Sequence, residues 1–279
     1  MRDGVPGFPV RQAVPPACLA GQTASPTGRA PAALAGQTAC PTGGAAAGLA
    51  GGTACPTPRA CELHDLGRMG YSKALELQRT LVEKRKRGLV PDQLLILEHP
   101  HTITLGRNGN LAHLLANEDI LRRAGIAFFP TDRGGDITYH GPGQMVGYPI
   151  LDLREWKRDV VAYVRAIEQA LIETLAEFGI AAGREAGMTG VWVEGRKIAA
   201  IGVHISRWIA SHGFALNVAT DLRYFQYIVP CGLAKPVTSM AELGAAPGRA
   251  ELIGSLARHF AELFGFEIAA PPSANEEAI

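Results

Sequence analysis

Two residues far apart in the sequence carry side chains suited to covalent chemistry. Cys231 lies in IVPCGL, a Pro-Cys-Gly turn after an apolar run, and a thiol on a turn can be reached by a substrate. Lys197 lies in the otherwise apolar run EGRKIAAIG. Each residue also has an interpretation without chemistry. Cys231 could be a small buried apolar side chain, and Lys197 could be a solvated lysine at the end of a hairpin. The pattern alone does not place Lys197 beside Cys231.

A glycine-rich segment at 133–144 is the third feature that indicates chemistry. Its sequence, RGGDITYHGPGQ, combines four glycines with arginine, aspartate, tyrosine and histidine. Glycines let backbone approach a ligand closely and leave N–H groups available to bind it. The nucleotide motifs GxxxxGK[ST] and GxGxxG are absent from this segment. The segment is therefore either a ligand-binding loop or a glycine-rich hairpin with incidental polar residues.

Composition limits the classes of partner. Lys and Arg number 27 against 26 Asp and Glu, a net charge of +1, which does not indicate a nucleic-acid-binding protein. No apolar run approaches the roughly 20 residues that a membrane-spanning helix needs, and no secretion signal is evident. The five cysteines show no CxxC pair or zinc spacing, so we expect no metal and no cofactor. These features predict a cytoplasmic protein without a membrane or nucleic-acid partner.

The first 58 residues differ from the rest of the chain. LAGQTASPTG at Leu19, LAGQTACPTG at Leu34 and LAGGTACPT at Leu49 repeat every 15 residues. One leucine per repeat supplies too little apolar surface to offset the ordering entropy of about 1–2 kcal/mol per residue. We expect residues 1–58 to be a disordered low-complexity extension, 59–270 to be the catalytic domain and 271–279 to be a flexible tail.

Hydrophobic periodicity predicts mixed helices and strands in that domain. The expected helices are 71–87, 118–123, 160–178 and 251–264, with Gly88 and Gly179 as stops for the first and third. The expected strands lie in QLLILEHP, TITLG, IAFFP, QMVGYPILDL, GVWVE, RKIAAIGVHIS and WIASHGFALNV, the last three as an antiparallel meander. There is no regular βαβ alternation, so the predicted class is α+β, with one central mixed or antiparallel sheet flanked by helices.

Four segments together carry a resemblance to a known family. EHPHTITLGR, RGGDITYHGPGQMVGYPILDL, GRKIAAIGVHISRWIASHGFALNV and VPCGL followed by TSM resemble the successive motifs of the lipoyl(octanoyl) transferases. The similarity runs from about Cys61 to Phe266 and does not cover the repeats. It implies a biotin/lipoate protein ligase-like fold. It also implies transfer of an octanoyl group from octanoyl-acyl carrier protein to a lysine of a lipoyl domain, the first step of protein lipoylation.

The resemblance also implies roles for individual residues. Cys231 matches the acyl-thioester cysteine, and Lys197 matches the lysine that lowers its pKa. The implied acceptors are the lipoyl domains of 2-oxoacid dehydrogenases and the glycine cleavage H protein. The implied substrate-binding residues are Arg133, Gly134, Gly135, Asp136, Ile137, Thr138, Tyr139 and His140, then Ala200, Ile201 and Gly202, then Gly213, Phe214 and Ala215.

Three alternatives remain beside this interpretation. An ATP-dependent lipoate or biotin ligase would share the fold but needs no nucleophilic cysteine, so Cys231 argues against it. A non-catalytic module that binds lipoyl domains or acyl carriers would not need both Cys231 and Lys197. A cysteine protease is a poorer fit, because no orienting partner for a Cys-His pair can be identified from spacing.

A basic run at 84–87, KRKR, is the only dense cluster of positive charge. At a helix end such cations complement the helix dipole, which is a sufficient structural reason for them. The same charges would also suit an acidic acyl carrier protein, so the run is a candidate docking patch.

Overall fold

The computed structural model describes residues 59–229 and 235–269. The predicted disordered extension, the predicted tail and Cys231 lie outside these ranges. All statements below concern the described residues.

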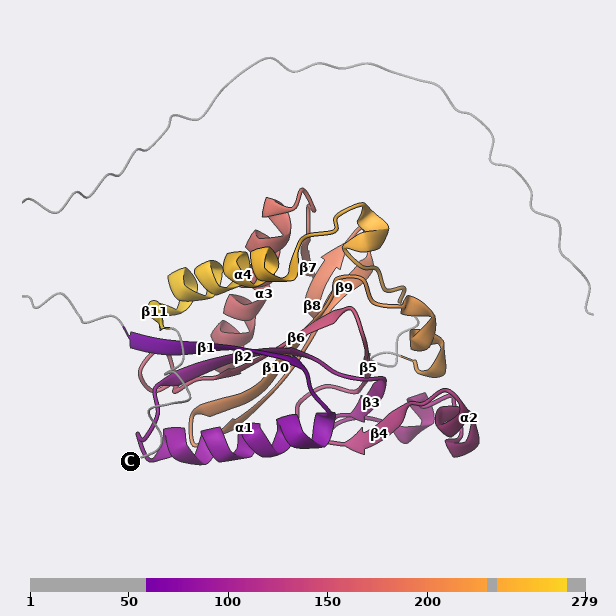
Figure 1. Ribbon diagram of the computed structural model, residues 1–279, viewed down its shortest axis with the longest axis horizontal. Coiled ribbons are helices and arrows are strands. Elements are labelled where there is room, and N and C mark those ends of the chain that lie inside the picture. Colours follow the sequence, from indigo (N-terminus) through magenta and orange to yellow (C-terminus); the bar gives the residue numbers. More distant parts are fainter. Residues whose placement is uncertain (1–58, 230–234, 270–279) are drawn as a thin grey trace, which may run out of the picture. The chain divides into compact units, whose positions relative to one another are not determined.

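An eight-stranded mixed sheet forms the centre of the fold (Figure 1). Its order is β11-β1-β2-β6-β10-β9-β8-β7. The strands are β1 (Arg59–Arg68), β2 (Asp92–Glu98), β6 (Gln144–Ile150), β7 (Gly183–Glu185), β8 (Met188–Val193), β9 (Arg196–Ser206), β10 (Ile209–Asn217) and β11 (Phe266–Ala269). β1 runs parallel to β2 and β11, whereas the other neighbours are antiparallel. The predicted α+β class and the β8-β9-β10 meander are confirmed.

A second sheet of three strands was not expected from the sequence. It has the order β4-β3-β5, with β3 (Thr102–Leu105), β4 (Ala127–Pro130) and β5 (Ile137–His140). β5 lies inside the glycine-rich segment, so part of that segment is a strand rather than a loop. A small core of Ile103, Tyr139 and Ile228 packs against this sheet. The pairing of β5 with β3 therefore holds this part of the glycine-rich segment in place.

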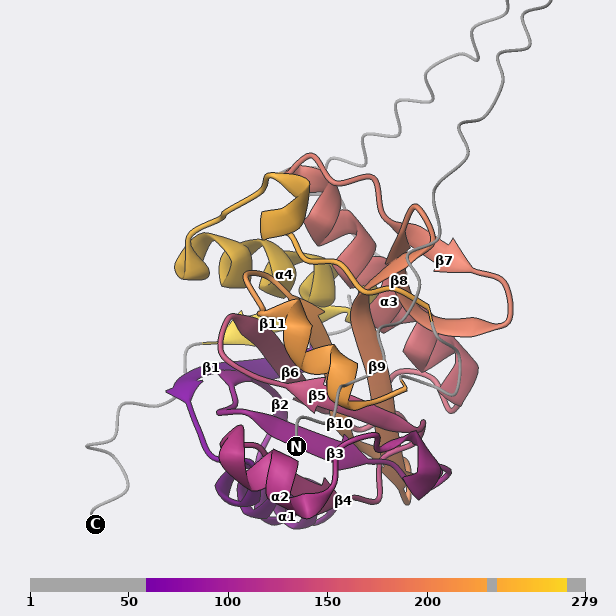
Figure 2. The same cartoon turned by 90° about the vertical axis from the view of Figure 1, so that its right-hand side faces the viewer.

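Helices cover both faces of the large sheet, as two perpendicular views show (Figures 1 and 2). α1 (Tyr71–Lys86) packs on one face against Leu95, Val146 and Ala215. α3 (Val160–Glu177) and α4 (Arg249–Phe264) pack on the other, in the main core, and α2 (Glu118–Arg123) is a short connecting helix. Among the described helices, none is both long and apolar enough to cross a membrane.

The predicted helix ends are confirmed by the backbone. Gly88 and Gly179 follow α1 and α3 with φ of +69° and +74°, the left-handed conformation that glycine adopts without a Cβ clash. Asp159 caps the start of α3 by accepting a hydrogen bond from the Ala162 N–H at 2.9 Å. These local signals fix where the long helices begin and end.

The basic run at the end of α1 is partly structural. Arg85 is only 7% exposed, and its guanidinium donates to Asp92 at 2.9 Å and to Glu155 at 2.6 Å. Arg85 is therefore part of a buried ion network and does not belong to a docking patch. Lys84 and Arg87 are exposed, whereas the Lys86 ammonium donates to Glu83 at 2.8 Å.

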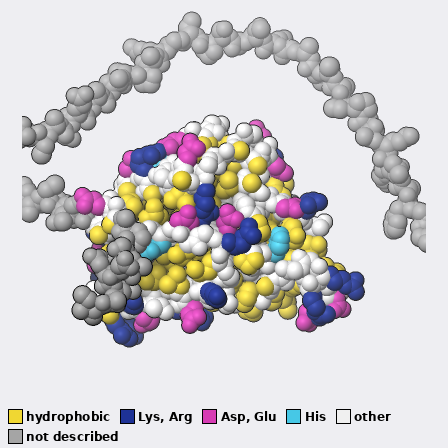
Figure 3. Space-filling view, in the orientation of Figure 1, with side chains coloured by type: hydrophobic (Ala, Val, Ile, Leu, Met, Phe, Trp, Pro, Cys, Tyr) yellow, Lys and Arg dark blue, Asp and Glu magenta, His cyan; other side chains and the backbone are white. Residues whose placement is uncertain are grey.

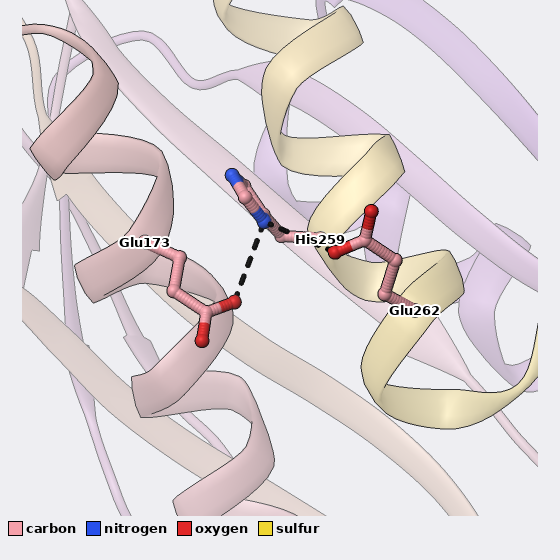
Figure 4. Close-up of side chains that lie close together, drawn as sticks. All are labelled: Glu173, His259 and Glu262. Atoms are coloured by element: carbon pink, nitrogen blue, oxygen red, sulfur yellow. Dashed lines mark ion pairs between the residues drawn. The ribbon is translucent and has the colours of Figure 1, made fainter. Parts of the chain in front are cut away.

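A histidine surrounded by carboxylates joins α3 to α4 (Figure 4). His259 Nδ1 lies 3.3 Å from Glu173 on α3 and 3.6 Å from Glu262, while its Nε2 lies 2.7 Å from Glu177. On the face that Figure 3 shows, positive and negative side chains are interspersed among apolar ones. The charge pattern agrees with the net charge of +1.

Candidate active site

The predicted site segments line one cavity with a volume of about 670 Å³. Its wall includes Arg133 to Thr138 and His140, Ala200 to Gly202, Gly213 to Ala215, and Lys197. The 200–202 and 213–215 segments meet because β9 and β10 are paired strands of one hairpin, and the 133–136 loop, far away in the sequence, packs on β9. The cavity is large enough for a medium-sized acyl substrate.

Tyr139 is the one predicted substrate-binding residue that does not line this cavity. It lies on the opposite face of β5 from Thr138 and His140, because side chains alternate along a strand. Its hydroxyl bonds His101 Nδ1 at 2.7 Å, and its ring stacks on Tyr224 at 5.2 Å. Tyr139 thus supports β5 from behind.

Arg133 holds the glycine-rich segment in place from inside the cavity wall. It is 8% exposed, and its guanidinium donates to the Thr104 carbonyl at 2.9 Å and to the Thr104 hydroxyl at 2.8 Å. The Gly134 N–H donates to the Val203 carbonyl at 2.9 Å. The first contact ties the segment to β3 and the second ties it to β9.

Two glycines allow these close approaches. A Cβ at Gly202 would lie 2.8 Å from the Gly134 carbonyl oxygen, so a side chain there would push the loop away from β9. A Cβ at Gly147 on β6 would lie 2.1 Å from the Phe214 ring, which forms part of the cavity wall. The shape of the cavity therefore depends on the absence of these side chains.

Lys197 lines the cavity near the start of β9. Its ammonium lies 4.6 Å from the centre of the Trp192 ring on β8, a cation–π distance. The Lys235 ammonium lies 5.2 Å from the same ring and also donates to Glu185 at 2.9 Å. Trp192 thus holds two cations at one side of the cavity.

Backbone hydrogen bonds hold the described residues on both sides of Cys231, and those after it are held at Lys197, which lines the cavity. After it, the Lys197 N–H donates to the Pro236 carbonyl at 2.9 Å, and the Thr238 N–H donates to the Lys197 carbonyl at 3.0 Å. Before it, the Val229 N–H donates to the His113 carbonyl at 2.8 Å. The described chain is therefore anchored by backbone hydrogen bonds shortly before and shortly after Cys231.

A buried histidine, His140, lines the cavity, and the ring of a second buried histidine, His99, lies 5.7 Å from it between ring centres. Burial lowers the pKa of His140 to about 3, with further lowering by His99 and Arg133. Burial also lowers the pKa of His99 to about 4. His140 Nδ1 donates to Gln144 Oε1 at 2.8 Å. Both imidazoles are therefore neutral at neutral pH, and the positive charge beside His140 comes from the Arg133 guanidinium.

Several lining residues were missed by the sequence analysis. Tyr71 comes from the first turn of α1, Trp192 from β8 and His212 from β10. Tyr71 and Trp192 were assigned only to a helix face and a strand, because an apolar aromatic in a periodic run gives no sign of a cavity. His212 does stand out as a polar residue in an apolar strand, WIASHGFALNV.

Comparisons with known proteins agree on the family. The lipoyl protein ligase A/B catalytic domain model matches residues 70–261. The chain is 68% identical over 210 residues to the octanoyltransferase of Solibacter usitatus, covering 75% of this chain and 96% of that one. It is 50% identical over 220 residues to the octanoyltransferase of Acidobacterium capsulatum, covering 73% and 89%. A bipartite lipoate protein ligase structure from Thermoplasma acidophilum matches with a TM-score of 0.62 at 16% identity, covering 79% and 89%, which shows the shared fold.

Proposed function

The chain belongs to the lipoyl protein ligase A/B catalytic domain family and is an octanoyltransferase, and from this premise we propose that Cys231 carries the octanoyl group as a thioester. The observation that supports this most is the backbone pairing of Lys197 with Pro236 and Thr238. That pairing fixes Lys197 beside the chain that follows Cys231. Lys197 is the residue we assign to both proton transfer and thiolate stabilisation.

In the first half-reaction the Cys231 thiolate attacks the carbonyl carbon of the donor thioester. A new sulfur–carbon bond forms and the bond between the acyl carbon and the donor sulfur breaks. The leaving donor thiolate takes up a proton from the Lys197 ammonium, which leaves Lys197 neutral. Because one thioester replaces another, the step needs no ATP. A nearby ammonium favours the thiolate over the thiol, which is the role given to Lys197 here.

In the second half-reaction a lysine amine of a lipoyl domain attacks the acyl carbon. The amide nitrogen–carbon bond forms, the sulfur–carbon bond breaks, and the amine loses one proton. Lys197, which gave its proton to the donor thiolate in the first half-reaction, accepts that proton as general base. Because the amide is more stable than the thioester, this step makes the overall transfer reaction favourable.

The apolar part of the cavity is suited to the alkyl chain. Ile201 and Phe214 lie on paired strands, opposite each other in the β9–β10 register, and both line the cavity. Each buried methylene contributes about 0.8 kcal/mol, so a chain of eight carbons gains enough to be held during transfer. The substrate-binding role proposed for residues 133–138, His140, 200–202 and 213–215 rests on their placement in this cavity.

As an octanoyltransferase the chain uses an acyl donor and lipoyl-domain acceptors. We assign the donor as octanoyl-acyl carrier protein, and the acceptors as the lipoyl domains of 2-oxoacid dehydrogenases and the glycine cleavage H protein. The location that suits these partners is the cytoplasm.

A donor comparison tests this proposal. The protein is incubated with an apo lipoyl domain and either octanoyl-acyl carrier protein or free octanoate plus ATP and Mg²⁺. Octanoyl-domain should appear by mass spectrometry with the first donor alone. Efficient transfer from octanoate and ATP, with none from the carrier, would reassign the chain to adenylate chemistry.

A further inference from the structure

Glu168 on α3 is a buried carboxylate that the proposed mechanism does not use. It is 0% exposed. Its Oε1 accepts a hydrogen bond from the Gly190 N–H at 3.0 Å, and its Oε2 accepts from Arg165 at 2.6 Å and from Arg184 at 2.9 Å. A carboxylate is tolerated in the interior only when it is paired and hydrogen-bonded, so Glu168 stays buried only while these contacts hold.

Two of these contacts join α3 to the β7–β8 hairpin, residues 183–193, which forms one edge of the large sheet (Figure 2). Gly190 lies in β8, and Arg184 lies in the short strand β7. Arg184 also donates to the Arg165 carbonyl at 3.0 Å and to Gln169 Oε1 at 2.8 Å, both on α3. Because an edge strand pairs with a neighbour on one side only, these contacts with α3 supply support that the sheet does not.

The same hairpin lies against the Lys197 side chain. A Cβ at Gly190 would lie 3.4 Å from Lys197 Cε and 2.7 Å from the Ala199 carbonyl oxygen, so the lysine stem passes beside the Gly190 backbone. Gly190 has a φ of +122°, which residues with a side chain rarely adopt. The Lys197 ammonium lies 4.6 Å from the centre of the Trp192 ring in the same strand. Lys197 is therefore positioned by the stretch of β8 that Glu168 holds.

The pairing of β8 with β9 is irregular at this point. Val191 is opposite Ala199, whereas Trp192 is opposite Lys197, so β9 carries one extra residue between the two pairs. Such a bulge re-aims side chains and locally disrupts the ladder of hydrogen bonds. It places Lys197 opposite Trp192, and it leaves β8 more dependent on the bond from Gly190 to α3.

We propose that Glu168 is a positioning residue for the transfer reaction, which keeps Lys197 in its reacting position by holding the β7–β8 hairpin on α3. This inference rests on the proposed function, because that function assigns proton transfer to Lys197. Glu168 does not line the cavity, so it acts through Lys197 rather than on the substrate. When a reacting group is misplaced by about 1 Å, the rate can fall on the order of 100-fold.

Two substitutions release the hairpin, and a third is the matched control. Glu168→Gln keeps the shape of the side chain, but an amide has one oxygen and cannot accept hydrogen bonds on both sides. Arg184→Gln removes the contacts of β7 with α3. Arg165→Gln removes a guanidinium from the same carboxylate, but that contact lies within α3. Each arginine variant leaves Glu168 one guanidinium partner, and both arginine side chains are partly exposed, so all three variants should fold.

The kinetic experiment measures kcat and KM for octanoyl-carrier and the rates of the two half-reactions. In Glu168→Gln kcat should fall at least about tenfold, while KM for the donor should stay within about twofold, because the residues that line the cavity are intact. Both half-reactions should slow, since Lys197 serves both. Arg184→Gln should change kcat in the same direction, and Arg165→Gln should keep the wild-type kcat.

The pH dependence of Cys231 alkylation by iodoacetamide separates positioning from a loss of stability. In Glu168→Gln the midpoint of that dependence should move to higher pH, because the Lys197 ammonium is no longer held where it favours the thiolate. Arg165→Gln should keep the wild-type midpoint. A variant that is only less stable would also keep it, provided that the protein stays folded over the pH range.

Hydrogen–deuterium exchange follows the hairpin without turnover. Amides of residues 188–193 should exchange faster in Glu168→Gln and Arg184→Gln than in wild type and Arg165→Gln. A wild-type kcat and alkylation midpoint in folded Glu168→Gln would overturn the proposal, and so would equal losses of kcat in Arg165→Gln and Arg184→Gln. If wild-type Cys231 takes up no octanoyl group while the exchange differs as expected, the proposed function is overturned and the anchoring of the hairpin stands.

Discussion

The Lys197 ammonium lies over the indole ring of Trp192, 4.6 Å from its centre. Such a contact contributes about 0.5–2 kcal/mol and limits the positions that the ammonium takes. Trp192→Leu should therefore slow acylation of the protein by about fivefold, because the ammonium is no longer held at the cavity wall. Trp192→Phe keeps a ring face and should lose less. Single-turnover acylation with octanoyl-carrier measures both variants, and equal rates for Leu and wild type would remove Trp192 from the site.

The Gly147–Phe214 contact predicts a sharp difference between two glycine substitutions. Gly147→Ala places a Cβ 2.1 Å from the Phe214 ring, so the ring must move into the cavity. We expect a loss of about 1–3 kcal/mol in unfolding free energy and a higher KM for the acyl donor. Gly254→Ala is the control, since Gly254 lies in α4 with open space around its Cβ position. It should stabilise the protein by up to about 1 kcal/mol in urea unfolding.

The buried His140 predicts acid sensitivity with a defined sign. An unfolded histidine has a pKa near 6.5. The folded His140 has a pKa of about 3, so between these values the unfolded chain binds a proton that the folded chain does not. Stability should therefore fall as the pH drops below about 6.5, by about 2 kcal/mol at pH 5 from this residue.

His140→Gln isolates that contribution. The loss of unfolding free energy between pH 7.5 and pH 5 should be smaller in the variant than in wild type by about 2 kcal/mol. His99, whose pKa is about 4, also contributes to the pH dependence of the unfolding free energy, so the variant should keep part of that dependence. A variant with the same pH dependence as wild type would show that His140 is charged in the folded protein.

The exposed part of the basic run gives a docking prediction. Lys84→Glu with Arg87→Glu should slow association with an acidic acyl carrier and flatten its salt dependence. Arg85 is left intact, because removing a buried partner of Asp92 costs about 3–5 kcal/mol of stability and would obscure binding. Stopped-flow association at several salt concentrations measures the effect. A wild-type salt slope in the double variant would place the carrier elsewhere.

Patterns within one segment were predicted well, whereas of the pairings between strands only the β8–β9–β10 meander was predicted. Gly88 and Gly179 ended their helices as expected, because a glycine stop is a local signal. β1 was missed because its sequence, RACELHDLGR, alternates apolar and polar residues only over positions 61–64, and its strand state comes from parallel pairing with β2 and β11. No periodicity in the sequence encodes that pairing.

Some residues of the site were also predicted from the sequence, whereas others were found only in the structure. The glycine-rich segment and the 200–202 and 213–215 stretches were found by resemblance, and the structure brings them to one cavity. Tyr139 was placed with them although alternation along β5 turns it to the other face. His212 also lines the cavity, and it is held by contacts with α1 and Asp132, which lie far away in the sequence. The sequence therefore supports a proposal for the reacting residues but does not predict the side chains that line the rest of the cavity.

Replacement of Lys197 separates its two assigned roles. Lys197→Arg keeps a positive charge, so the thiolate of Cys231 should still form and accept the octanoyl group. A guanidinium does not release its proton in proteins, so transfer to the lipoyl domain should be slow. Rates of the two half-reactions are measured separately by rapid quench. Wild-type transfer by the arginine variant would remove Lys197 as general base.

The thioester on Cys231 is the central claim, and intact mass measurement tests it most directly. Wild-type protein mixed with octanoyl-carrier, without a lipoyl domain, should gain one octanoyl group, which peptide mapping places on Cys231. Hydroxylamine should remove it, because thioesters are labile to hydroxylamine and amides are not. Cys231→Ala should show neither adduct nor transfer. Transfer by Cys231→Ala at the wild-type rate, or an adduct that resists hydroxylamine, would contradict the account.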